Sequence, residues 1–112
     1  MKDRIDLLIE LLFDQQASIA ERDDAAVDLA NFNDPRAISA LLACASNKQE
    51  NELVLNSCGE SLGAIWVSQN DFNEQAYHNL SSTSRYGIYY VVDARRPEWV
   101  KKYNLDNDEF LD

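Results

Sequence analysis

Apolar residues recur along the chain with the spacing of amphipathic helices. Between residues 4 and 13, Ile5, Leu8 and Leu12 stand at positions i, i+3 and i+7, which places them on one face of a helix. The same kind of pattern predicts six helices, over residues 4–13, 19–32, 35–46, 50–67, 72–81 and 84–95. We therefore predict an all-α protein without a β-sheet.

Polar breaks separate the predicted helices. Ser18 precedes the second helix and Glu21 follows three residues later, which is the spacing of a capping box. Before the third helix, Asp34 is a predicted N-cap and Pro35 stands at the first helical position, where its missing N–H group is not needed. These signals predict where individual helices begin.

The sixth predicted helix leaves an alternative open. Residues 89–92, YYVV, are aromatic and β-branched, and such residues also suit a strand. We predict a helix here because the segment continues an internal repeat, but a strand over residues 86–92 stays possible at this point. Pro97 ends the segment, and residues 98–103 are expected to add one short helical turn.

The chain carries an internal period of about 33 residues. Leu29 is matched by Leu62, 33 positions later, and a weaker third copy places Val92 30 positions further on. Small residues surround the first two copies and would let neighbouring helices approach closely. A helical hairpin cannot bury its apolar face alone, so a repeat of this length predicts hairpins that stack on one another.

Two segments resemble a known family. Residues 33–42, NDPRAISALL, resemble the first helix of a HEAT-like repeat of the short bacterial type, in which a DPRAV-like turn begins each hairpin. Residues 61–65, SLGAI, resemble the A-L-G-x-I ending of the second helix. Arg22 and Arg85 stand where the family often has an arginine near the start of the second helix, and Leu55 departs from that pattern.

The resemblance is good over residues 20–66 and weakens over residues 1–19 and 67–96, where the third repeat lacks the DPRA turn. It implies about three stacked helical hairpins that form a short right-handed α-solenoid, a scaffold used for binding. Under this interpretation, residues 1–103 form one domain. Residues 104–112 are expected to form a frayed acidic tail.

Charge narrows the class of partner. The 112 residues include 20 acidic and 10 basic side chains, for a net charge of −10. Such a surface repels nucleic acid and anionic lipid and attracts basic proteins. No apolar stretch approaches the roughly 20 residues of a membrane span, and residues 1–16 do not resemble a signal peptide. We expect a cytoplasmic protein, with Cys44 and Cys58 as buried free thiols.

Candidate chemistry is sparse. His78 is the only histidine, and no cysteine or second histidine stands at ligand spacing. Carboxylate pairs such as Asp23 and Asp24 fall on polar helix faces, where water keeps them ionised. The chain has no glycine-rich phosphate loop. We expect no catalytic, cofactor or metal site, and a protein-binding module in place of an enzyme.

Two features are candidates for partner contact. If Leu29 faces the core, Asp24 and Asp28 face outward, and the 33-residue offset puts Ser57 and Ser61 in register with them. Tyrosine and tryptophan near the C-terminus suit interface anchors. The predicted contacts are Asp24, Asp28, Asn56, Glu60, Tyr86, Tyr90 and Trp99. A solvated surface is the alternative for the polar positions. A C-terminal cap of the core is the alternative for Trp99 and, less strongly, for Tyr86 and Tyr90.

Size, acidity and the HEAT-like resemblance together suggest a function. Short acidic proteins of this kind resemble immunity proteins that neutralise toxins of contact-dependent growth inhibition systems. The expected partner is then a basic toxin domain, in particular a nuclease, bound by a protein that is monomeric when free. An adaptor in a larger bacterial assembly is a second hypothesis. A third is a relative of the HEAT-like chromophore lyases of phycobilisomes, which are longer.

Overall fold

A computed structural model describes residues 1–110, and every regular element among them is helical. The α-helices are α1 (Arg4–Phe13), α2 (Ile19–Asp28), α3 (Pro35–Ala45), α4 (Glu52–Gln69), α5 (Glu74–His78), α6 (Ser82–Arg95) and α7 (Pro97–Lys102). Two 3-10 turns, η1 (Leu29–Asn31) and η2 (Leu105–Asn107), complete the fold. The all-α prediction is confirmed, and residues 86–92 are helical.

The helix starts follow the local signals. Ser18 and Glu21 form both hydrogen bonds of the capping box, since Glu21 N donates to Ser18 Oγ at 3.1 Å and Ser18 N donates to Glu21 Oε1 at 3.2 Å. Asp34 caps α3 by accepting from Arg36 N at 2.8 Å, and Pro35 is the first helical residue. Capping satisfies N–H groups that lack intrahelical partners.

Two predicted helices are shorter than their apolar patterns suggested. The second ends at Asp28 and continues only as the 3-10 turn η1, with Phe32 after it in extended conformation. The fifth has five residues and begins only after Asn73, which caps it by accepting from Ala76 N. Phe72 lies before this cap and joins the core as a loop residue, packing against Trp66 with ring centroids 5.2 Å apart.

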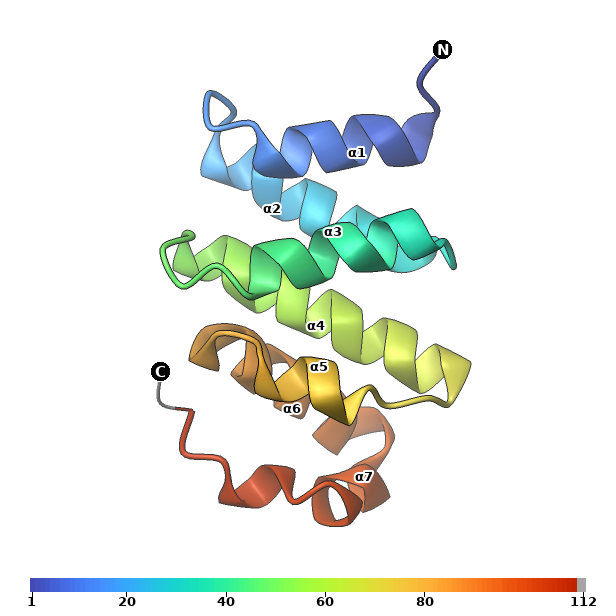
Figure 1. The fold of residues 1–112 in the computed structure, drawn as a ribbon, viewed down its shortest axis with the longest axis vertical. Helices are drawn as coiled ribbons and strands as arrows, with labels where there is room; N and C mark the ends of the chain where they lie inside the picture. Colours follow the sequence, from blue (N-terminus) through green and yellow to red (C-terminus); the bar gives the residue numbers. More distant parts are fainter. Residues whose placement is uncertain (111–112) are drawn as a thin grey trace.

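The helices follow one another along the long axis of the molecule, from α1 at one end to α7 at the other (Figure 1). Helix α4 packs against α2 on one side and against α6 on the other, while α1 packs on α2 and α3 on α4. Leu29 and Leu62, matched by the internal period, are both fully buried. The right-handed α-solenoid stays a prediction.

Glycines allow α4 and α6 to touch backbone to backbone. A Cβ atom added to Gly59 would lie 2.1 Å from Ser84 O, and one added to Gly87 would lie 2.6 Å from Asn56 O. Both distances are too short for real contacts, so any side chain here would push the helices apart. This close crossing fixes the position of the α6 side chains relative to those of α4.

Two arginines tie the hairpins to the segments that follow them. Arg22 donates from Nε to Leu12 O at 2.8 Å and from Nη2 to Glu50 Oε2 at 2.5 Å. Arg85 donates from Nη1 to Leu80 O at 2.7 Å and from Nε to the Asp108 carboxylate at 2.9 Å. Each guanidinium therefore joins a carbonyl near the end of the preceding helix to a carboxylate further along the chain.

Residues 104–110 are packed and do not form the frayed tail that we expected. Leu105 is buried in the core, and Asp108 accepts from both Arg85 and Tyr77. The Phe110 ring packs against Tyr86, with ring centroids 5.3 Å apart. The acidic composition suggested solvation, but one apolar anchor and one ion pair hold this segment on the domain. Residues 111 and 112 lie outside the described part of the chain.

Candidate functional site

Four of the predicted contact residues line one cavity between α4 and α6. Asn56 and Glu60 project from α4, and Tyr86 and Tyr90 project from α6. We call this cavity, of about 310 Å³, the α4–α6 pocket. Tyr86 is 51% exposed and Tyr90 is 59% exposed. Because Tyr86 and Tyr90 are one helical turn apart, both present large side chains on the same side of α6.

Asn56 orients the carboxylate of the pocket. Its Nδ2 donates to Glu60 Oε1 at 2.8 Å, one turn further along α4. The Asn56 backbone also contacts α6, since a Cβ atom added to Gly87 would lie 2.6 Å from Asn56 O. The pocket is therefore built on two helices in direct backbone contact, which gives its side chains little freedom to separate.

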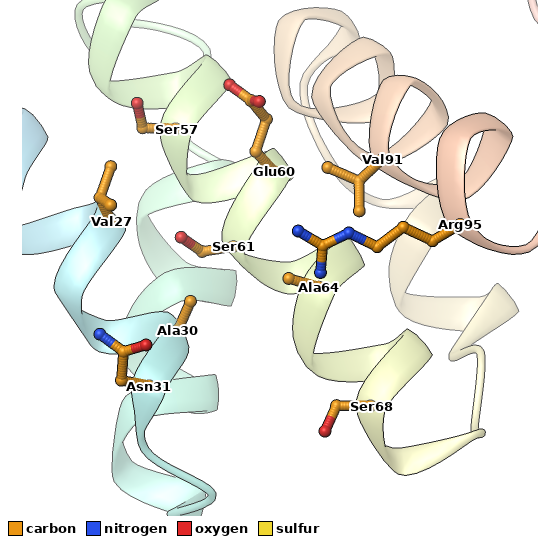
Figure 2. Close-up of a pocket in the computed structure, with 10 residues that line it drawn as sticks. All are labelled: Val27, Ala30, Asn31, Ser57, Glu60, Ser61, Ala64, Ser68, Val91 and Arg95. Carbon is orange, nitrogen blue, oxygen red and sulfur yellow. The ribbon is translucent and has the colours of Figure 1, made fainter.

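A larger groove shares Glu60 with the pocket. It encloses about 430 Å³ between α2 with η1, α4 and α6, and we call it the α2–α4–α6 groove. Its lining residues, drawn in Figure 2, are Val27, Ala30, Asn31, Ser57, Glu60, Ser61, Ala64, Ser68, Val91 and Arg95. Most of these side chains are small, so the groove is open toward the α4 backbone. Arg95 extends across it and its guanidinium lies beside Ala64 (Figure 2).

The serines of the predicted polar stripe join helices to one another. Ser57 donates to the Asp23 carboxylate, and Ser61 Oγ donates to Ala26 O at 2.7 Å. Both serines are buried. Ser84 repeats this arrangement on α6, where its Oγ donates to Leu55 O at 2.8 Å. The period placed Ser57 and Ser61 in register with Asp24 and Asp28 on an outward polar stripe, but both hydroxyl groups are buried and bond to Asp23 and Ala26 of α2.

The two acids of α2 stand beside the groove and do not line it. Asp24 is exposed, and Asp28 lies 3.4 Å from Arg4 in an exposed ion pair. Val27, between them in sequence, lines the groove. Exposed pairs of this kind contribute little to stability. Neither carboxylate belongs to the lining of the groove.

Trp99 is not available as a surface anchor. Its side chain is 3% exposed and packs edge-on against Phe72, with ring centroids 5.7 Å apart. Arg96 covers the ring at 4.4 Å from its centroid. Trp99 thus belongs to a C-terminal cap of the core, which was the alternative to an interface anchor. Trp99 therefore drops out of the set of residues that a partner can reach directly.

Burial and pairing shift several pKa values close to the C-terminal segment. Burial, together with its hydrogen bond to Asp108, raises the pKa of Tyr77. For Asp108, burial acts to raise the pKa, but hydrogen bonds from Tyr77, the Phe110 N–H group and Arg85 outweigh it and hold the pKa below its usual value. Both shifts follow from the contacts that hold the Asp108 carboxylate against Tyr77 and Arg85.

The described residues include no arrangement suited to a metal. Within residues 1–110, no three His, Cys, Asp or Glu side chains come together as a metal site would require. His78 is exposed, and its Nε2 lies 4.0 Å from Glu74. No helix in this part of the chain has the length and apolar character needed to cross a membrane.

Comparisons with protein-family models, with curated proteins and with solved structures each found no significant match. The function proposed for the chain therefore depends on the side chains of the pocket and the groove.

Arg95 and Phe110 were not among the predicted contact residues. Arg95, on the groove, carried no motif, and its position follows only from how α6 crosses α4. Phe110 lay in the segment expected to be a tail, although a single aromatic residue among acids at positions 104–112 was a detectable signal. Its packing against Tyr86 makes the C-terminal segment part of the candidate site.

Proposed function

We propose that this chain is a protein-binding module whose contact surface is the α4–α6 pocket together with the α2–α4–α6 groove. The observation that supports the proposal is the convergence of Glu60, Tyr86 and Tyr90 on one pocket between two tightly packed helices. Exposed tyrosines are favoured interface anchors because they bury a large area with few rotatable bonds. A rigid support reduces the entropy lost on binding.

Charge favours a basic partner. The net charge of −10 attracts positively charged proteins over a Debye length of about 8 Å at physiological salt, and Asp24 and Glu60 lie on or beside the proposed contact surface. Complementary charge of this kind speeds association more than it slows dissociation. Charge reversal of Asp24 should therefore reduce the association rate, and added salt should shrink the difference.

In its specific form, the proposal is an immunity protein that binds and neutralises a basic toxin domain, in particular a nuclease. This step follows from the HEAT-like resemblance of residues 33–42 and 61–65 and from the acidity of the chain. An acidic surface next to exposed tyrosines suits a cleft that otherwise holds nucleic acid, because carboxylates can take the place of phosphates. The protein would act in the cytoplasm, as a monomer until it meets the toxin.

Co-expression with a candidate toxin tests this function. If a large exoprotein is encoded next to this chain, its C-terminal domain is the toxin to test. We expect restored growth and a one-to-one complex on co-purification. Tyr90→Ala should weaken the complex, whereas Leu7→Ala, which truncates an exposed apolar side chain on α1, should not. A complex without growth rescue would favour an adaptor, and the absence of any complex would contradict the proposal.

A further inference from the structure

Glu60, like Asp23, is a partly buried carboxylate whose hydrogen-bond partner is a neutral side chain. Glu50 pairs with Arg22 and Asp108 pairs with Arg85. Within residues 1–110, by contrast, no basic side chain lies within ion-pair distance of Glu60, whose hydrogen-bond partner is the neutral amide of Asn56. A half-buried carboxylate without a cation, at the edge of an open pocket, leaves part of its charge unsatisfied.

Arg95 does not supply the missing cation. It lines the α2–α4–α6 groove together with Glu60. Figure 2 shows the Arg95 guanidinium beside Ala64 and the Glu60 carboxylate directed away from it. Glu60 also lines the α4–α6 pocket, together with Tyr86 and Tyr90.

The two tyrosines add a second feature that attracts a cation. The face of an aromatic ring carries partial negative charge and binds guanidinium or ammonium groups placed over it. The Phe110 ring packs edge-on against the Tyr86 ring, at an interplanar angle of 84°. Tyr90 stands one turn further along α6. A cation that enters the pocket meets both the rings and the Glu60 carboxylate.

We propose that the α4–α6 pocket binds an arginine side chain of the partner protein, with Glu60 as its counter-ion and Tyr86 and Tyr90 as its walls. The inference rests on the proposed function, because it names the group that the partner inserts. Arginine fits better than lysine for two reasons. Its planar guanidinium stacks on aromatic rings, and it donates paired hydrogen bonds to a carboxylate.

Titration with small probes tests the pocket without any partner protein. The ¹⁵N-labelled protein is titrated with acetyl-arginine N-methylamide, with the lysine analogue, and with the neutral isostere acetyl-citrulline N-methylamide. We expect saturable amide shifts at Asn56, Glu60 and Gly87 with the arginine probe. Binding should be about tenfold weaker for citrulline, as expected on losing a charge-assisted hydrogen bond. The lysine probe should bind more weakly than arginine.

Matched variants locate the counter-ion. Glu60→Gln keeps an acceptor for Asn56 and should weaken arginine binding about tenfold. Asp93→Asn removes the same unit of charge from an exposed position on α6 outside the pocket and should leave binding unchanged. Tyr90→Leu should weaken it about threefold by removing one ring face.

Two results would overturn the inference. Equal binding of the arginine and lysine probes, or equal effects of Glu60→Gln and Asp93→Asn, would mean that the net charge alone attracts these cations. Because the titration contains no partner, it can fail while the toxin complex forms normally. In that case the proposed function would stand and only the arginine pocket would be lost.

Discussion

Arg22 and Arg85 occupy matching places near the two ends of the stack, yet the carboxylates that they bind come from different sources. The Arg22 partner, Glu50, lies in the loop that precedes α4, so one hairpin is fastened to the next. The Arg85 partner, Asp108, lies in the C-terminal segment after the last hairpin. Residues 104–110 thus supply to Arg85 the carboxylate that the loop before α4 supplies to Arg22.

The two ion pairs also differ in their exposure to water. The side chains of Arg22 and Glu50 are 4% and 7% exposed, and those of Arg85 and Asp108 are 11% and 17% exposed. We call Arg22–Glu50 the inner pair, because water has little access to either side chain when its partner is lost. We call Arg85–Asp108 the outer pair, because water can partly hydrate it if the C-terminal segment lifts away. The C-terminal segment is thus a cap of the stack, and because Phe110 supports Tyr86, it is also part of the proposed site.

The largest expected effect comes from the inner pair. Arg22→Met leaves the Glu50 carboxylate buried without a cation, and breaking a buried pair in this way costs about 3–5 kcal/mol. Urea denaturation should therefore show a large loss in the free energy of unfolding. The matched control is Arg36→Met, which breaks exposed pairs with Asp3, Asp6 and Asp34 and should change stability little. Equal losses in both variants would contradict the special role of Arg22.

A smaller effect is expected at the outer pair. Asp108→Ala removes the acceptor of Arg85 and Tyr77, and losing partners for such donors costs about 1–3 kcal/mol. Hydrogen exchange should show reduced protection at Leu105 and Phe110, because the segment is freed. Asp106→Ala changes an exposed acid in the same segment and serves as the control. If Asp108→Ala destabilises the protein as much as Arg22→Met, the distinction between inner pair and cap is lost.

The smallest effect is the acid sensitivity of the two pairs. Burial acts to raise the pKa of Glu50, but hydrogen bonds from Arg22 and Asn51 N outweigh it and lower the pKa below the ordinary value of 4.5. Asp108 is likewise lowered from 3.8. A lowered pKa stabilises the fold above the unfolded value, and this stabilisation is lost as the pH falls through the folded value. The loss should therefore begin below about pH 4.5, starting with Glu50.

Thermal melts between pH 7 and pH 3 measure this effect. The stability difference between the wild type and Glu50→Gln should shrink as the pH falls below 4.5, and that of Asp108→Asn should shrink at lower pH. A difference that stays constant down to pH 3 would mean that neither pair contributes through its ionised carboxylate.

Local signals in the sequence determined the helices and much of their stacking order. Capping by Ser18 and the Asp34-Pro35 start depend on residues within a few positions of one another, and the Leu29–Leu62 period depends on a fixed spacing along the chain, so each can be recognised from the sequence alone. The same reasoning proposed Asn56, Glu60, Tyr86 and Tyr90, because helical periodicity gives the side on which each residue stands.

Only the tertiary structure decided which of these residues meet. The α4–α6 pocket exists because Gly59 and Gly87 let two helices cross in backbone contact, and no local pattern reports that distance. Burial of Trp99 and the folding back of Asp108 onto Arg85 depend likewise on contacts between residues far apart in sequence. Composition predicted a solvated acidic tail over residues 104–112. Among residues 104–110, however, the Arg85–Asp108 ion pair and the buried Leu105 hold the segment on the domain, because packing acts on individual side chains.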